Sequence, residues 1–266
     1  MARAAQQWAE DLAAWEIPKA VLDAAPESPW GFPPALFARE AAERAASPGT
    51  AGPSRDRAAE ALAGEGSVLD VGSGGGAASL ALVPPADLLV AVDQSDELLR
   101  SFSEAAARRG VAHREVRGTW PDVAAEVDAA DVVVCHHVLY NVADLVPFVM
   151  ALTDHARRRV VVELTLRHPQ VALNHLWHAL HGLDRPNGPT AQDAKAVLVE
   201  AGLNVDAEEW ERPSLWAGVE RAERVAFARR RLCVGPERDA EIDALLGPDH
   251  EGPLRRAVTL WWDGGG

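Results

Sequence analysis

The spacing of apolar residues along the chain changes near residue 67. Before that point, Trp8, Leu12 and Trp15 recur at near-helical spacing, and Ile17-Pro18 interrupts the pattern. After it, short apolar runs alternate with longer amphipathic segments, as strands alternate with the helices that connect them. The pattern therefore predicts a helical N-terminal segment followed by an α/β unit.

Seven apolar runs have the length and composition of strands. They are residues 67–71, 88–92, 111–117, 131–135, 159–164, 203–210 and 256–263. Helices are expected to begin at residue 77 and to span residues 97–109, 143–156, 169–182 and 190–202. Such βαβ alternation predicts a parallel, doubly wound sheet.

The two ends of the chain are expected to add helical segments to this sheet. We predict an N-terminal helical segment or lid at residues 1–60, a main domain at 61–266, and a helical cap inserted at 214–250 between the last two strands. The loop at residues 26–34 (PESPWGFPP) combines rigid prolines with Trp30 and Phe32. Two interpretations of this loop are open: it packs the N-terminal helices onto the main domain, or it forms a lid over a small-molecule pocket.

Composition and charge limit the function. The 266 residues are 48% hydrophobic and 25% charged, which is typical of a globular protein that buries a sizeable core. The formal net charge of −14 repels phosphate backbones and disfavours nucleic acid as the main partner. Two arginine runs, residues 157–159 and 229–231, are interpreted as solvated faces or helix C-termini, with a local nucleic-acid patch as the alternative.

The cysteines and the N-terminus suggest a location. Cys135 and Cys233 are too few for a disulfide framework, so a reducing compartment is expected. Charges every few residues interrupt the N-terminal segment, and no window approaches the roughly 18 apolar residues of a membrane span. We therefore predict a cytoplasmic protein with no membrane partner; the sequence does not indicate an oligomeric state.

The strongest chemical motif follows the first predicted strand. It reads Val68-Leu69-Asp70-Val71-Gly72-Ser73-Gly74-Gly75-Gly76. A glycine turn between a strand and a helix lets a ligand lie against backbone amides at the carboxyl edge of a sheet. The motif therefore indicates a nucleotide-cofactor site, although glycine turns also serve packing alone.

An acidic residue supports the cofactor interpretation. Asp93 ends the second predicted strand, 23 positions after Asp70, where a carboxylate can accept hydrogen bonds from both hydroxyls of a ribose. With Asp70 in the pattern D-x-G-x-G-x-G, the chain resembles the class I S-adenosylmethionine (SAM) dependent methyltransferases. In that family an acidic residue at the position of Asp70 lies near the amino-acid part of the cofactor. The likeness covers about residues 60–165.

The resemblance implies a seven-stranded Rossmann-like sheet, mostly parallel with an antiparallel last strand, and SAM as the cofactor. After the third strand, Gly118-Thr119-Trp120 replaces an acidic residue of the family with Thr119, while Trp120 either stacks on the adenine or packs in the core. Leu98 matches an apolar position near the adenosine. The cofactor residues implied are Asp70, Gly72, Ser73, Gly74, Gly76, Asp93, Gln94, Leu98, Thr119, Trp120 and Cys135.

The stretch VVVCHHVLYNV at residues 132–142 ends the fourth predicted strand, where the resemblance places the methyl acceptor. His136 and His137 are candidate catalytic bases, because a histidine accepts a proton near neutrality, and Tyr140 is a candidate to orient the acceptor. Residues that leave a strand in succession point to opposite sides, so one of the two histidines is expected to face the acceptor. Cofactor positioning and structural hydrogen bonding stay open for each, and Asn141 is expected to be a turn or cap residue.

Other polar residues are open to more than one role. His175, His178 and His181 follow one helical face but adjoin no cysteine or carboxylate, so no metal site is predicted and a polar face or a pocket lining is expected instead. Glu163, at the end of the fifth strand, is expected to bind a cationic acceptor group or to pair with an arginine such as Arg167.

The function predicted from these features is SAM-dependent methyl transfer to an oxygen or nitrogen of a small molecule. An RNA or protein methyltransferase is the first alternative, although CHHVLYNV lacks the N-P-P-Y-like tetrapeptide of RNA enzymes. A non-catalytic SAM-binding regulatory protein is the second alternative, and a nucleotide-dependent oxidoreductase is the third.

Overall fold

A computed structural model describes residues 3–30, 39–42, 52–214, 216–247 and 254–266. These residues contain a seven-stranded sheet with the order β3-β2-β1-β4-β5-β7-β6. Strand β7 is antiparallel to both of its neighbours, and the other pairs are parallel. The predicted α/β fold with an antiparallel last strand is confirmed.

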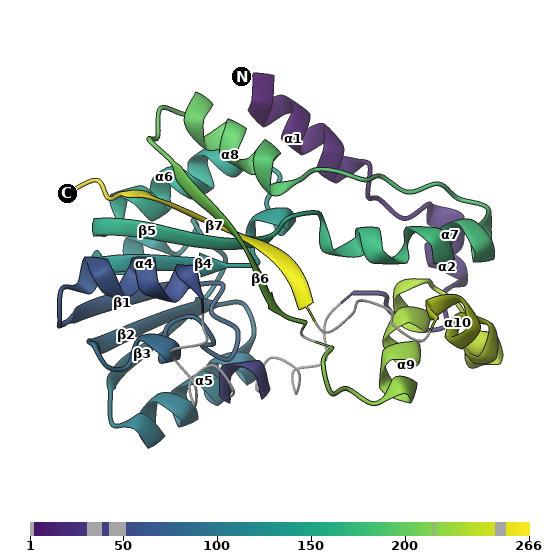
Figure 1. The fold of residues 1–266 in the computed structure, drawn as a ribbon, viewed down its shortest axis with the longest axis horizontal. Coiled ribbons are helices and arrows are strands. Elements are labelled where there is room, and N and C mark those ends of the chain that lie inside the picture. Colours follow the sequence, from purple (N-terminus) through teal and green to yellow (C-terminus); the bar gives the residue numbers. More distant parts are fainter. Residues whose placement is uncertain (1–2, 31–38, 43–51, 215, 248–253) are drawn as a thin grey trace.

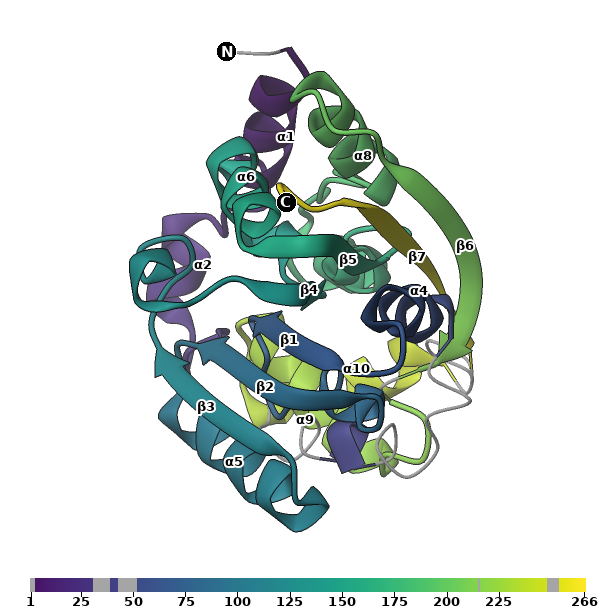
Figure 2. The same cartoon turned by 90° about the vertical axis from the view of Figure 1, so that its left-hand side faces the viewer.

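Figure 2 shows the strands in this order across the molecule. Their bounds are Gly66–Val71 (β1), Ala86–Asp93 (β2), Ala112–Arg117 (β3), Ala130–His136 (β4), Ala156–Thr165 (β5), Asp206–Pro213 (β6) and Leu254–Asp263 (β7).

Side chains of the central strands alternate between two buried layers, as the period of two in a strand requires. Val132 and Val134 of β4 face a layer formed with α4 (Pro53–Leu62) and α5 (Asp96–Arg109). Val133 and Cys135 face the opposite layer, formed with α1 (Arg3–Ala13), α6 (Leu145–Asp154) and α8 (Ala191–Glu200). Because both faces are covered, the inner strands are apolar runs without polar alternation.

The N-terminal helix α1 docks through Trp8, which is 0% exposed. The indole nitrogen of Trp8 donates to the carbonyl of Val142 at 2.8 Å, and its ring stacks on Tyr140. The indole of Trp15 donates to the carbonyl of Gly188 at 2.6 Å, just before α2 (Lys19–Ala24). The apolar face predicted from Trp8, Leu12 and Trp15 therefore joins the N-terminal segment to the main domain.

The predicted boundary between the N-terminal segment and the main domain is at residue 60. That position lies inside α4, which packs against β4, β5 and β7, so α4 belongs with the sheet. Much of the loop at residues 26–34 lies outside the described residues. The assignment of residues 1–60 as a lid remains a prediction.

Helices α9 (Arg221–Arg231) and α10 (Asp239–Leu246) lie between β6 and β7 along the chain, where a helical insertion was predicted. Figure 1 shows them beside the sheet, near α7 (Asn174–His181) and α2. They share a third apolar cluster with α7 and Ile17, built around Trp177, Leu232 and Ile242. The cap therefore packs on the segment that follows β5 and on the N-terminal segment.

Four sequence predictions need correction. The described residues between the glycine turn and β2 contain no α-helix. They form turns and a short 3-10 helix at Leu80–Leu82, because Pro84 and Pro85 leave no length for an α-helix before β2. Residues 169–182 divide into a 3-10 turn, Pro169–Leu173, and α7. Two strand starts differ by three residues from the expectation: β6 begins later, at Asp206, and β5 begins earlier, at Ala156.

The local end signals of two helices are confirmed. Thr190 and Asp193 form a capping box at the start of α8. Gly110 ends α5 with a left-handed φ of 68°. Within the described part of the chain, no helix is long and apolar enough to cross a membrane.

Both arginine runs contribute to tertiary contacts. Arg158 donates to the carbonyls of Ala61 and Leu62 at the end of α4, at 3.0 Å each. Arg229 forms an ion pair of 2.9 Å with Asp239 at the start of α10. These arginines link secondary-structure elements, and the second run occupies the helix C-terminus that was predicted for it.

Candidate active site

The glycine turn after β1 is attached to the end of β2. The amides of Gly72 and Ser73 both donate to the carbonyl of Val92, at 2.8 and 3.1 Å. Gly72 has a φ of +70°, and a Cβ built on it would lie 2.4 Å from Cγ2 of Val138. Only glycine allows this approach between the turn and the segment that follows β4.

Gly74 faces open space. It has a φ of +53°, and no described atom lies within 4 Å of a Cβ built on it. Its amide donates to Oδ2 of Asp93 at 2.9 Å, and Oδ1 of Asp93 accepts from the amide of Ser95 at 2.9 Å. The carboxylate at the end of β2 therefore lies against the glycine turn, and each of its oxygens keeps capacity for another hydrogen bond.

Asp70 lies inside the turn. It is 1% exposed, and its Oδ2 accepts from the hydroxyl and the amide of Ser79 at 2.6 and 3.2 Å. Burial raises the pKa of Asp70 to about 6. Asp70 therefore stabilises the turn directly, and a role beside the amino-acid part of a cofactor remains a prediction.

Three more residues predicted to contact the cofactor are buried. Cys135 is 0% exposed, and burial raises the pKa of its thiol well above the usual value. The hydroxyl of Ser73 is enclosed without a hydrogen-bond partner among the described residues. Gly76 packs between Phe102 and Leu80. The side chain of Cys135 is thus a core group.

The structure places Trp120 in the core. Trp120 is 6% exposed, its indole nitrogen donates to the carbonyl of Phe148 at 3.4 Å, and its ring meets His155 edge-on. Of the two roles left open for Trp120, core packing matches these surroundings, because an enclosed indole offers no face for stacking on a base. Among its predicted neighbours, Gln94 and Thr119 are exposed and Leu98 is half-buried.

The two histidines after β4 have different surroundings. His137 lines a cavity and its side chain is 32% exposed, whereas the side chain of His136 is 11% exposed and is not part of the cavity wall. The amide of His137 donates to the backbone carbonyl of Glu163 at 2.7 Å, and its φ of +60° turns the chain out of the strand. Nε2 of His137 lies 3.0 Å from Oε1 of Glu163.

Glu163 and Arg212 form a buried ion pair beside His137. Glu163 is 0% exposed, and Nη1 of Arg212 donates to its Oε1 at 2.8 Å. Arg212 also contacts Nε2 of His137 and the carboxylate of Glu40. The predicted pairing of Glu163 with an arginine is therefore confirmed, with Arg212 of β6 in place of Arg167.

These charges act on the pKa of His137 in opposite directions. Burial lowers it below its usual value, and the Arg212 guanidinium lowers it further, while Glu163 and Glu40 raise it. The net shift is downward, so the imidazole of His137 is neutral at pH 7.

Tyr140 holds the segment after β4 in place. Its hydroxyl donates to the carbonyl of Thr165 at 2.8 Å, and burial raises the pKa of the phenol. Its ring lies between Trp8 and His168. Asn141 is exposed at the end of the short 3-10 turn Leu139–Asn141, which agrees with the predicted turn role.

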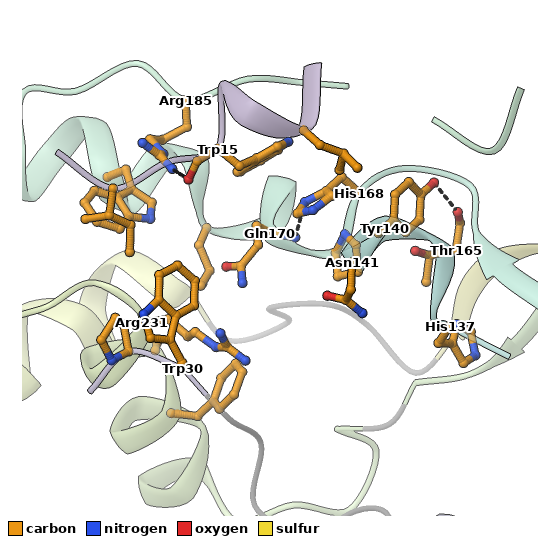
Figure 3. Close-up of a pocket in the computed structure, with 18 of the residues that line it drawn as sticks. Trp15, Trp30, His137, Tyr140, Asn141, Thr165, His168, Gln170, Arg185 and Arg231 are labelled. Carbon is orange, nitrogen blue, oxygen red and sulfur yellow. Dashed lines mark hydrogen bonds between the residues drawn. The ribbon is translucent and has the colours of Figure 1, made fainter. Parts of the chain in front are cut away.

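A cavity of about 760 Å³ lies where the N-terminal segment, the ends of β4 and β5, and the cap meet. Figure 3 shows Asn141 and Gln170 with their amide groups directed into it, and His137 at one side. The polar and aromatic residues of its wall include Trp15, Trp30, Glu40, His137, Tyr140, Asn141, Thr165, His168, Gln170, Trp177, Arg185, Arg212, Trp216, Arg224, Phe227 and Arg231. The residues of the glycine turn and Asp93 are not part of this wall.

Sequence reasoning missed most of this wall. One available signal was the helical spacing of Arg224, Phe227, Ala228 and Arg231, which places them on one face of α9. The pairing of Arg212 with Glu163 and Glu40 had no local signal, because these residues are far apart in the sequence.

The histidines after β5 bind separate partners. His175 contacts the carbonyl of Leu245, His178 pairs with Asp184, and His181 contacts the carbonyl of Leu232. His168 stacks on Trp15 in the cavity wall. In the part of the chain that the structure describes, no group of three or more histidine, cysteine or acidic residues is arranged to hold a metal ion.

A family model matches the part of the chain that contains the glycine turn and the end of β4. Residues 69–159, which include the glycine turn, Asp93 and the two histidines, match the family model described as "Methyltransferase domain". No curated protein matches the chain.

Two solved structures show the extent of the shared fold. The YcgJ protein from Bacillus subtilis is 18% identical over 76% of this chain and 92% of its own, with a TM-score of 0.51. The plantazolicin methyltransferase BamL, solved with a triazolic desmethylPZN analog and SAH, is 12% identical over 98% of both chains, with a TM-score of 0.52. The likeness to BamL includes the N-terminal segment and the cap.

The matched residues include the glycine turn and Asp93, and the described strands form the seven-stranded sheet that the sequence predicts. Residues 69–159 therefore form a methyltransferase domain on a class I, Rossmann-like sheet, and the chain is an enzyme whose cofactor is S-adenosylmethionine.

Proposed function

We propose that this enzyme methylates an oxygen or nitrogen atom of a small molecule bound in the cavity beside His137. The observation that carries the proposal is the cavity itself, about 760 Å³ in volume and bounded by three separate parts of the chain. A concave site of this size suits a drug-sized compound. BamL, which shares the fold over its whole length, was solved with a substrate analog and SAH, and this gives further support.

The residues around the glycine turn fit the cofactor. The open side of Gly74 leaves room for a ligand close to the backbone, and the remaining acceptor capacity of Asp93 suits two ribose hydroxyls. When bound, S-adenosylmethionine supplies an electrophilic methyl group on its sulfonium. Asp93, Gly72 and Gly74 are proposed to hold it, while Gln94, Leu98 and Thr119 border the same edge of the sheet.

His137 is proposed to take the proton from the attacking atom. Nε2 of His137 lies beside Oε1 of Glu163, which accepts hydrogen bonds, and Nη1 of Arg212, which donates them. When Nε2–H is directed to Glu163, the lone pair is on Nδ1, which has no hydrogen bond to any described residue. After Nδ1 accepts the proton, the carboxylate of Glu163 stabilises the imidazolium. The neighbouring residues Tyr140 and Asn141 shape the wall in which the acceptor is aligned.

Replacement of Asp93 by alanine is expected to weaken SAM binding by about 10-fold to 150-fold, because hydrogen bonds to a charged group contribute about 1.5–3 kcal/mol. Calorimetry on the folded variant measures this change. Asp87→Ala, at an exposed position of the same strand, is the matched control and should bind SAM like the original enzyme. Equal SAM affinity of the Asp93→Ala and Asp87→Ala variants would show that Asp93 does not bind the ribose.

A labelled transfer assay tests the acceptor class. The enzyme is incubated with cell extract and SAM carrying a radioactive methyl group, and the products are separated by size. The same extract incubated without the enzyme gives the blank. Label in the small-molecule fraction is the expected result. Label confined to RNA or protein would contradict the proposal, and SAM binding without transfer to any fraction would favour a regulatory protein.

A further inference from the structure

One face of α9 forms a wall of the cavity. Arg224, Phe227, Ala228 and Arg231 are spaced by three or four residues, which brings them to the same side of a helix, and all four line the cavity. Arg231 is 7% exposed, and its guanidinium carbon lies 5.1 Å from the ring centre of Phe227. The cap therefore presents two arginines, two turns apart, with an aromatic ring between them.

Among the described residues, the cavity wall carries more positive than negative side chains: two carboxylates, Glu16 and Glu40, and five arginines, Arg185, Arg212, Arg224, Arg231 and Arg255. Arg212 is balanced by Glu163 and Glu40. Arg185 and Arg224 are not balanced in this way, since among the described residues no carboxylate lies within ion-pair distance of either one. The guanidinium of Arg185 instead donates to the backbone carbonyls of Trp15 and Glu16 and lies over the rings of Trp15 and Trp177.

The charge in the cavity is local, because the whole chain has a formal net charge of −14. Because the net charge of the protein is negative, the protein as a whole does not attract anions over long distances. The arginines gathered in the cavity therefore attract an anion only at short range. Burial and the neighbouring Arg230 lower the pKa of Arg231 to about 10, which leaves it protonated at pH 7. A bound anion would offset the effect of burial and of Arg230 on the pKa of Arg231.

Aromatic rings cover the remaining surface near α9. Trp216 packs against Phe227 with 4.5 Å between the ring centres, and Trp15 and Trp177 line the same cavity. Trp30 lines it too, yet it is 55% exposed. A large apolar ring that stays in solvent at the edge of a cavity is suited to cover a flat ligand.

We propose that the methyl acceptor is a multi-ring aromatic compound with an anionic group, a carboxylate or a phosphate, which Arg224 and Arg231 bind. The inference rests on the proposed function, because it treats the cavity as the acceptor site. Arginine suits this task, since its planar guanidinium donates two parallel hydrogen bonds to such a group and stacks on aromatic rings. Trp216 and Phe227 provide the adjoining apolar surface.

Binding of four matched probes tests the charge preference. Calorimetry on the SAH-saturated enzyme compares naphthalene-2-carboxylate, 2-naphthyl phosphate, the neutral 2-naphthamide and the cationic 2-naphthylmethylammonium. At least one anion is expected to bind about tenfold more tightly than the amide, with the ammonium weakest. The tighter anion identifies the group as a carboxylate or a phosphate. An amide that binds as tightly as both anions, or no binding of either anion, would overturn the proposal.

Variants assign the preference to α9. Arg224→Gln and Arg231→Gln are each expected to remove most of the advantage of the anion and to leave amide binding unchanged. Arg231→Lys keeps the positive charge and should retain part of the advantage of the anion over the amide. Arg238→Gln is the matched control, because Arg238 lies in the cap outside the cavity and pairs with Glu241. An anion preference that survives in both glutamine variants contradicts the assignment.

SAH binding in the same samples distinguishes a failure of the acceptor proposal from a failure of the proposed function. An enzyme that binds SAH but shows no anion preference refutes the acceptor chemistry and leaves methyl transfer intact. An enzyme that fails to bind SAH refutes the proposed function itself.

Discussion

Replacement of His137 by asparagine is expected to slow methyl transfer by about 100-fold to 10,000-fold, the usual contribution of a general base. SAH affinity should stay unchanged, because His137 lines the cavity proposed for the acceptor and Asp93 and the glycine turn do not. Asparagine is the best substitute, since His137 has a φ of +60° and asparagine tolerates left-handed backbone. Steady-state kinetics with the acceptor found in the labelled transfer assay measure the loss.

The pH profile distinguishes a base from a structural residue. A base acts when neutral, and the pKa of His137 is lowered, so kcat/KM should rise with pH below 6.5 and be level at pH 7. Glu163→Gln removes a carboxylate that raises this pKa and should move the rising limb to lower pH. The rise of kcat/KM with pH should be absent in the His137→Asn variant.

Two further histidines serve as comparisons. His178→Asn changes an exposed side chain outside the cavity and should retain full turnover. His136→Asn should cost less than His137→Asn, because His136 is not part of the cavity wall. A larger loss in the His136 variant, or full turnover in His137→Asn, would show that the base has been assigned to the wrong histidine.

Much of the fold could be predicted because its determinants are local. The apolar runs, the turn glycines and the Thr190–Asp193 capping box each act within a few residues, and the structure has them where they were expected. The helix expected after Gly76 failed for a local reason too, since Pro84 and Pro85 end the segment early. Strand β6 was misplaced by three residues, because its polar side chains give a weak apolar pattern.

The arrangement of the glycine turn and Asp93 was more predictable than the arrangement of the cavity wall. Asp93 meets Gly74 because two parallel strands end at one edge of the sheet, and strand order can be inferred from the sequence. The cavity depends on how the N-terminal segment and the cap pack together, and no local pattern encodes that. Arg231 illustrates the limit: it belongs to a run expected to be a solvated face or a helix end, yet it is buried in the cavity wall.

Glu163→Leu is expected to lower the free energy of unfolding by about 3–5 kcal/mol, the usual cost of removing one partner from a buried ion pair. Glu163 is 0% exposed, and the side chain of Arg212 is 9% exposed, so water cannot replace the lost carboxylate. Glu40 still contacts Arg212, but the hydrogen bond to Oε1 and the contact with His137 are lost. Urea denaturation, followed by circular dichroism, measures the change.

A double variant tests whether the cost comes from the charge left behind. Glu163→Leu combined with Arg212→Met removes both partners, and it should recover most of the lost stability, because apolar residues of similar volume replace a buried pair at little cost. Glu241→Leu, which breaks the exposed pair with Arg238, is the control and should change the free energy by about 0.5 kcal/mol or less. A double variant as unstable as Glu163→Leu alone would mean that Glu163 stabilises the fold mainly through groups other than Arg212, and Arg212 would then be available to act on the acceptor.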